Sequence, residues 1–134
     1  MIKLICGRSR AGKTTYSKRY DDVIHLDLCG GLTNCYDKAL EKVRAKEGDV
    51  IMDGVYNTIE RRTALLEAYK GGGEKVCIWL DTPLEVIEQR FFGKWKPMNL
   101  PHLFEPPTLD EGWDEIVIIR GDDNVERISR KTED

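Results

Sequence analysis

The sequence predicts a single α/β domain built on a five-stranded parallel sheet. Five short apolar runs are continuous rather than alternating, as is typical of strands buried on both faces. Segments with helical periodicity separate these runs, and such alternation indicates parallel strands joined by right-handed crossovers. The chain has 134 residues, of which 40% are hydrophobic and 34% charged. This length and balance fit one globular domain over residues 1–134.

The apolar runs define the expected strands, which in chain order are Ile2–Cys6, Val23–Leu26, Val50–Met52, Val76–Leu80 and Ile116–Ile119. Parallel strands end at one common edge of their sheet, where ligands of such folds bind. We therefore look for functional residues directly after the strands.

Four helices are expected between the strands, with the ranges Lys13–Tyr20, Leu32–Val43, Ile59–Tyr69 and Pro83–Phe92. Thr33 and Thr58 are candidate caps of the second and third helices, and Gly71–Gly73 ends the third. The buried face of the third helix is expected to consist of Ile59, Thr63, Leu66 and Tyr69.

Two segments lack this periodicity. Residues 93–111 carry four of the five prolines and indicate a long loop over the ligand edge, with a lid region at about 84–104. The polar tail, residues 122–134, is expected to be a frayed helix or disordered.

The net charge of −3 argues against nucleic-acid binding through overall basicity. Residues 1–20, however, carry six cations and no acid, so this end is suited to anions. Two of these cations, Lys18 and Arg19, could equally be solvated side chains on a helix face.

No apolar run is long enough for a membrane-spanning helix, so we expect a soluble, cytoplasmic protein without a membrane partner. The four cysteines form no C-x-x-C pair and are expected to be buried thiols. His25 and His102 have no clustered ligands, which argues against a transition-metal site.

The most specific motif runs from Gly7 to Thr14 and matches G-x-x-x-x-G-K-[ST], the phosphate-binding P-loop or Walker A motif. It follows an expected strand and opens an expected helix, which is the context that the motif requires. The glycines let backbone N–H groups face the phosphates, Lys13 neutralises the β and γ phosphates, and Thr14 binds Mg²⁺. The motif thus predicts binding of ATP with Mg²⁺. The residues expected to bind the nucleotide are Gly7, Arg8, Ser9, Arg10, Ala11, Gly12, Lys13, Thr14, Thr15 and Arg120.

Three aspartates follow expected strands. Asp27 is the candidate general base for an acceptor hydroxyl, or else a turn aspartate that binds loop amides. Asp53 is the candidate acid that orients Mg²⁺ with Thr14. Asp81 precedes Thr82-Pro83 and is better explained as a helix cap.

Arg90 and Lys94 are the candidate cations for charge on a transferring phosphoryl group. Arg90 could instead interact with the last carbonyls of the expected fourth helix. Which of the two would clamp the phosphoryl group stays open.

Across nearly its whole length the chain resembles the kinase domain of animal-type and phage-type polynucleotide 5′-kinases. Besides the P-loop, the matching segments end in Asp27, Asp53 and Arg90, and the most specific match is Phe104-Glu-Pro-Pro-Thr-Leu-Asp-Glu-Gly-Trp113. The resemblance implies a three-layer P-loop kinase fold with strand order 2-3-1-4-5 and a short lid. It also implies that Asp27 is the base that deprotonates a 5′-hydroxyl. Lys94 stands where relatives carry a second lid arginine.

We therefore expect a kinase that transfers the γ-phosphoryl group of ATP to a hydroxyl, preferably the 5′-hydroxyl of a DNA or RNA end. One alternative acceptor is a nucleoside, nucleotide or other small metabolite. Another alternative is an ATP-binding module or ATPase with little transfer activity. The sequence leaves the acceptor and the oligomeric state open.

Overall fold

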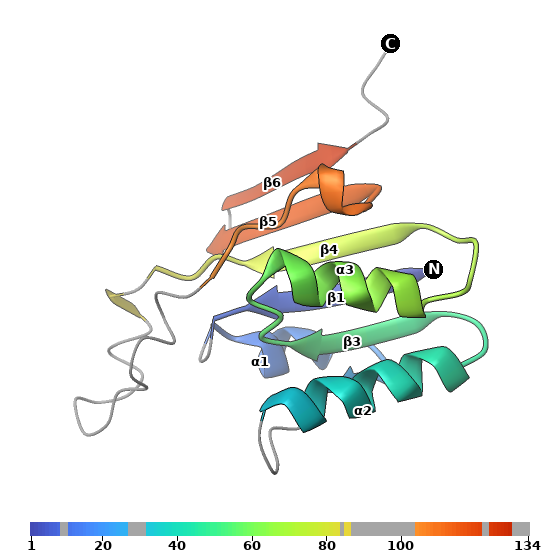
Figure 1. The fold of residues 1–134 in the computed structure, drawn as a ribbon. Helices are drawn as coiled ribbons and strands as arrows, with labels where there is room; N and C mark the ends of the chain where they lie inside the picture. The colour runs from blue at the N-terminus through green and yellow to red at the C-terminus, as the bar shows by residue number, and fades with distance from the viewer. Residues whose placement is uncertain (9–10, 27–31, 84, 87–103, 122–123, 130–134) are drawn as a thin grey trace.

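The structure, a computed structural model, describes residues 1–8, 11–26, 32–83, 85–86, 104–121 and 124–129 (Figure 1). It is an α/β fold with a mostly parallel, mixed sheet of six strands in the order β2-β3-β1-β4-β5-β6. The strands are β1 (Ile2–Gly7), β2 (Ile24–His25), β3 (Val50–Gly54), β4 (Lys75–Leu80), β5 (Glu115–Gly121) and β6 (Asn124–Ser129). The five expected strands are all present, and β1 to β5 pair in parallel.

The expected five-stranded, purely parallel sheet is wrong at its outer edge, where β6 pairs antiparallel with β5. The expectation of a frayed helix or disorder in the tail is therefore also wrong for residues 124–129. β6 is almost entirely exposed, and its apolar residues are Val125 and Ile128. Ile128 lies opposite Ile116 of β5 in the sheet, and Ile116 belongs to the part of the core on the α2 and α3 face. A strand with so few buried positions has almost no hydrophobic pattern in the sequence.

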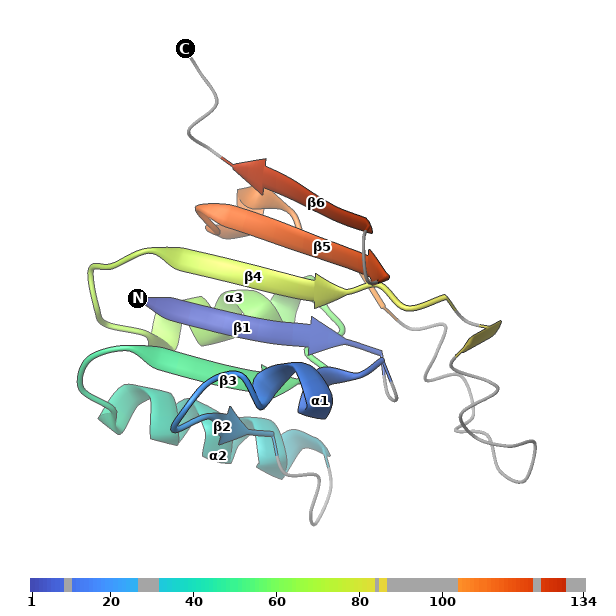
Figure 2. The same cartoon turned by 180° about the vertical axis from the view of Figure 1, so that it is seen from behind.

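Three helices lie among the described residues: α1 (Lys13–Ser17), α2 (Leu32–Ala45) and α3 (Ile59–Ala68). Figures 1 and 2 show α2 and α3 on one face of the sheet and α1 on the other. α1 ends at Ser17, three residues before the expected end. α2 begins at Leu32, so Thr33 lies inside the helix and is not its cap. Most of the expected fourth helix, Pro83–Phe92, lies outside the described residues.

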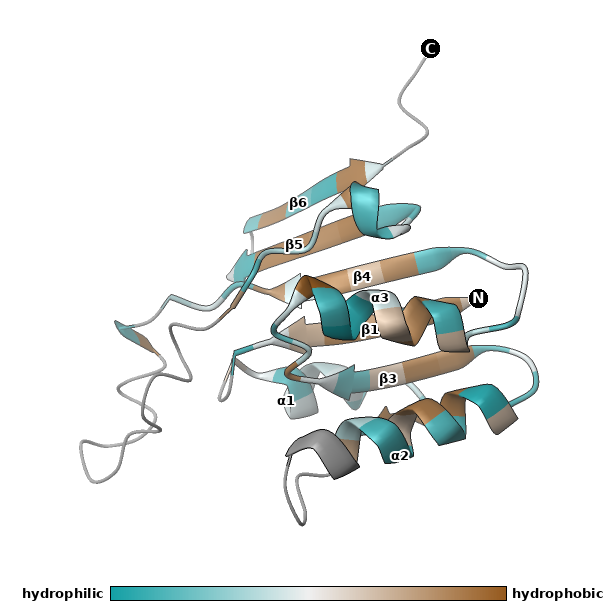
Figure 3. Ribbon diagram, in the orientation of Figure 1, coloured by the Kyte–Doolittle hydropathy of each residue, from teal (hydrophilic) through white to brown (hydrophobic). Residues whose placement is uncertain are grey.

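The core has two parts, one on each face of the sheet. The larger part packs β1, β3, β4 and β5 against α2 and α3, and the smaller part lies on the α1 face around Ile5 and Ile78. Figure 3 shows the apolar residues concentrated along the central strands. The expected buried face of α3 is confirmed at Leu66 and Tyr69 and wrong at Ile59, which is exposed. Thr63 is half-buried. The buried residues that the expectation missed are Arg62, Leu65 and Ala68.

Among the described residues, the structure contains no helix with the length and apolar character needed to cross a membrane. Cys6, Cys35 and Cys77 are buried free thiols, as expected. Cys29 lies outside the described residues.

Candidate functional site

The Gly7–Thr14 segment connects the end of β1 to the start of α1. A Cβ atom at Gly7 would lie 2.9 Å from the carbonyl oxygen of Leu80, so only glycine allows this approach to β4. Gly12 has a φ of 106°, a left-handed conformation that glycine adopts without strain. The loop is held to the segment after β4 by a 2.8 Å hydrogen bond from the hydroxyl of Thr82 to the carbonyl of Ala11. Both motif glycines are thus required by the path of the backbone.

The Lys13 side chain folds back over this loop. Its ammonium donates to the carbonyl oxygens of Gly7 at 3.1 Å and Arg8 at 2.7 Å. Burial lowers the pKa of Lys13 to about 8, against opposing contributions from Cys6 and Asp53. A partly desolvated ammonium whose hydrogen bonds run to neutral carbonyls is suited to receive an anion.

Asp53 lies buried at the end of β3, with both carboxylate oxygens close to the Nδ1 atom of His25, at 3.0 and 2.9 Å. His25 lies directly opposite Asp53 in the pairing of β2 with β3. Sequence reasoning considers both residues but misses this pair, because the register between two short strands is not visible in the sequence. Thr14, the other residue expected at Mg²⁺, is exposed on α1.

No group of three or more His, Cys, Asp or Glu residues that could hold a metal ion occurs in the described part of the chain. Mg²⁺ at a phosphate site takes one or two protein ligands and completes its shell with phosphate oxygens and water. The Thr14 hydroxyl and the Asp53 carboxylate are oxygen donors of the kind that this ion prefers, so the donor chemistry fits.

The Asp81 carboxylate faces two arginines. One of its oxygens lies 3.9 Å from a guanidinium nitrogen of Arg8, and the other accepts from Arg120 at 3.3 Å. Arg120 also donates to Glu126 of β6 at 2.9 Å. As a cap, Asp81 would bind the N–H of residue 84, which lies outside the described residues. Asp81 therefore joins the start of the motif loop to the end of β5.

Arg62 is a buried residue that sequence reasoning assigns to no site. It is fully buried, pairs with the Glu111 carboxylate at 2.9 Å, and donates to the carbonyls of Tyr56 and Glu105 at 2.7 and 2.6 Å. These bonds tie α3 to the segment 104–113, which contains the short 3₁₀ helix Leu109–Glu111 before β5. The expected loop is therefore wrong at Leu109–Glu111, whereas residues 104–108 form no helix or strand, as expected.

The segment 104–113, which Arg62 holds to α3, contacts the motif loop through Phe104. Its ring stacks on Trp79 of β4, with ring centroids 5.7 Å apart, and the Arg8 guanidinium lies 5.6 Å from the Phe104 centroid. Arg8 is thus held between an aromatic face and the Asp81 carboxylate. No sequence pattern indicates this arrangement, since its members come from separate parts of the chain.

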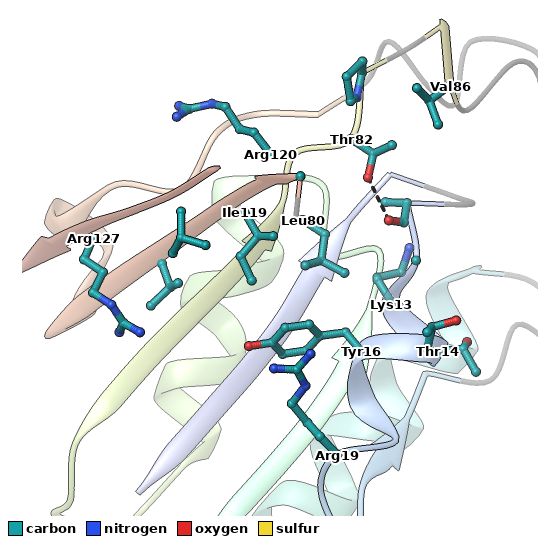
Figure 4. Close-up of a pocket in the computed structure, with 17 residues that line it drawn as sticks. Lys13, Thr14, Tyr16, Arg19, Leu80, Thr82, Val86, Ile119, Arg120 and Arg127 are labelled. Atoms are coloured by element: carbon teal, nitrogen blue, oxygen red, sulfur yellow. Dashed lines mark hydrogen bonds between the residues drawn. The ribbon is translucent and has the colours of Figure 1, made fainter. Parts of the chain in front are cut away.

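A groove of about 1130 Å³ opens beside the motif, between α1 and the strands β4, β5 and β6 (Figure 4). Its lining includes the expected nucleotide-binding residues Ala11, Gly12, Lys13, Thr14, Thr15 and Arg120. Other predicted site residues lie outside the described part of the chain, namely Ser9, Arg10, Asp27, Arg90 and Lys94. The groove therefore brings together the carboxyl-terminal half of the motif and Arg120, at the edge where the parallel strands end.

The chain was compared with known protein families and with curated proteins, and neither comparison found a match.

Proposed function

We propose that this chain is an ATP- and Mg²⁺-dependent P-loop kinase that transfers the γ-phosphoryl group to a hydroxyl, preferably the 5′-hydroxyl of a DNA or RNA end. The observation that carries the proposal is the G-x-x-x-x-G-K-[ST] segment, which connects β1 to α1 and has Lys13 folded over its carbonyls. The resemblance to polynucleotide 5′-kinases adds the acceptor class.

In this proposal the ammonium of Lys13 leaves the carbonyls of Gly7 and Arg8 for the β and γ phosphates of ATP. The buried position favours this exchange, because an anion restores the charge stabilisation that burial removes. Arg8 is held at the start of the loop by Asp81 and Phe104, and adds a second cation near the phosphates.

Mg²⁺, when bound, would neutralise charge on the phosphates and orient the γ-phosphoryl group. Thr14 would bind it directly, and Asp53 would act on it through a water molecule. His25 fixes the orientation of the Asp53 carboxylate in this arrangement.

The base in this proposal is Asp27. Asp27 itself lies outside the described residues; the preceding residue, Leu26, donates its N–H to the carbonyl of Asp53 at 2.9 Å. Asp27 takes the proton of the acceptor hydroxyl while the acceptor oxygen bonds to the γ-phosphorus. The bond from the γ-phosphorus to the β–γ bridging oxygen breaks, and ADP leaves.

Incubation with γ-labelled ATP, Mg²⁺ and a panel of 5′-hydroxyl oligonucleotides, nucleosides and nucleotides tests the proposal. We expect label on the oligonucleotides. Asp27→Asn should reduce turnover by roughly 10² to 10⁴, the usual contribution of a positioned base. Lys13→Ala should abolish transfer, whereas Lys42→Ala, which removes an exposed lysine from α2, should leave it unchanged.

Transfer to no member of the panel, together with retained binding of ATP, would favour a nucleotide-binding module instead. A small acceptor is the second candidate function, because the net charge of −3 is unusual for a nucleic-acid enzyme. Label on nucleosides or nucleotides alone would establish it.

A further inference from the structure

The Asp81 carboxylate lies between two arginines, Arg8 and Arg120, that the sequence assigns to the nucleotide. One of its oxygens is 3.9 Å from a guanidinium nitrogen of Arg8, and the other accepts a 3.3 Å hydrogen bond from Nε of Arg120. Arginine binds carboxylates and phosphates with the same planar N–H groups. The Asp81 carboxylate and a nucleotide phosphate therefore compete for the same two guanidinium groups.

The backbone around Asp81 is fixed from two sides. Its N–H donates to the carbonyl of Ile119 in β5 at 2.9 Å, and the hydroxyl of the next residue, Thr82, donates to the carbonyl of Ala11 in the motif loop at 2.8 Å. The Asp81 side chain is 27% exposed, so solvent and salt screen its attraction to the arginines less than at an open surface. Because this backbone is held, an exchange of partners has to come from movement of the arginine side chains.

The Arg120 guanidinium is directed away from the motif. Figure 4 shows its side chain extending away from Lys13, although Arg120 and Lys13 both line the groove. On that side it donates to Asp81 and, at 2.9 Å, to Glu126 of β6. The backbone of Arg120 is thus at the groove while carboxylates outside the lining hold its charge.

From this arrangement we infer that Asp81 is an inhibitory residue, whose carboxylate holds Arg8 and Arg120 until the phosphate chain of a nucleotide replaces it. The inference rests on the proposed function in that the replacing group is the triphosphate of ATP. It goes beyond that function by giving Asp81 control over which nucleotides bind. A triphosphate brings enough negative charge to displace the carboxylate from both arginines, whereas a single phosphate does not.

The test measures the binding of ATP, tripolyphosphate and AMP by isothermal titration calorimetry in the presence of Mg²⁺. Asp81→Asn keeps the shape of the side chain and removes its charge, so it should tighten the binding of ATP and of tripolyphosphate by about two- to tenfold. Binding of AMP should stay unchanged. Asp81→Ser should reproduce the gain, and Asp81→Glu, which keeps the charge, should bind ATP like the parent.

Two further comparisons isolate the contact itself. Asp110→Asn removes the same charge from an exposed position in the short 3₁₀ helix and should change no affinity. In the Arg8→Gln/Arg120→Gln background, Asp81→Asn should no longer tighten binding, because the groups that it releases are gone.

Weaker or unchanged binding of ATP by Asp81→Asn would overturn the inference, since Asp81 would then position the arginines for the phosphates or have no influence on them. An equal gain for AMP and ATP would overturn it too. So would a gain that persists without the two arginines, because Asp81 would then act only through its long-range charge.

The proposed function fails in a different way. Tighter ATP binding by Asp81→Asn without phosphoryl transfer to any acceptor would support the inhibitory carboxylate and exclude the kinase activity. Phosphoryl transfer by a parent protein whose ATP affinity is insensitive to Asp81→Asn would support the kinase activity and exclude the inhibitory carboxylate. Failure of both the parent and Asp81→Asn to bind ATP and tripolyphosphate would exclude both.

Discussion

Arg62 and Glu111 form a nearly solvent-free ion pair, with side chains 0% and 1% exposed. The desolvation of both charges is offset by their mutual attraction and by the carbonyls of Tyr56 and Glu105. Such a pair contributes little net stability, but loss of one partner leaves the other charge buried and uncompensated.

Arg62→Met should therefore lower the free energy of unfolding by about 3–5 kcal/mol, measured by urea denaturation. Arg44→Met, at an exposed position, is the control, and it should change the free energy of unfolding by less than about 0.5 kcal/mol. The double variant Arg62→Met/Glu111→Leu should lose less unfolding free energy than the sum of the losses in the two single variants. A loss below about 1 kcal/mol for Arg62→Met would contradict the buried pair.

Lys13 should make stability depend on pH in the alkaline range. Its pKa is about 8 in the folded protein, against 10.5 for an ordinary lysine. Between these values the unfolded chain binds more protons, so the free energy of unfolding of the parent rises with pH. Below about pH 8 lysine is charged in both states, and its burial costs up to about 3 kcal/mol.

We therefore expect Lys13→Met to be more stable than the parent at neutral pH, and this advantage to shrink as the pH rises from about 8 to 10.5. Urea denaturation of both proteins at several pH values measures the difference. A constant difference over this range would show that the lysine is not desolvated.

At the scale of elements, the β1 to β5 strands could be predicted because their apolar runs are continuous. The Gly7–Thr14 loop could be predicted because its residues are contiguous in sequence. The burial of Arg62 on α3 could not be predicted, since this residue is polar and its partner Glu111 is 49 positions away. The His25–Asp53 pair depends on strand register, which local pattern does not encode.

The sequence predicts the start of α3 from Thr58, and the structure confirms it. The Thr58 hydroxyl accepts a 3.2 Å hydrogen bond from the backbone N–H of Arg61. Thr58→Ala should lower the free energy of unfolding by about 1 kcal/mol. The matched control is Thr63→Ala in the same helix, whose hydroxyl donates to the Glu60 carbonyl; we expect a change within about 0.5 kcal/mol. Equal losses in both variants would exclude a specific capping contribution.

At the scale of the whole molecule, β6 forms one edge of the sheet. It covers the outer edge of β5 with a strand that is polar and charged, including Glu126 and Arg127. Such residues disfavour pairing between the edges of two molecules.

Deletion of residues 122–134 should expose the backbone N–H and C=O groups of β5 together with Ile116. We expect a loss of at least about 1 kcal/mol in the free energy of unfolding, which lowers the melting temperature by several degrees. We also expect concentration-dependent association, measured by light scattering after size exclusion. A truncated chain that remained monomeric and equally stable would show that β6 does not protect the edge.

The antiparallel course of β6 has a practical consequence for handling the protein. Ser129 is paired with Glu115 at the start of β5, in the same row of the sheet as Val76 and Lys3, one residue from the start of β4 and of β1. A tether or fusion partner joined after Ser129, or ahead of Ile2, would thus emerge at the end of the sheet remote from Lys13. Molecules immobilised through either attachment point would present the edge that carries Lys13 to the surrounding solution.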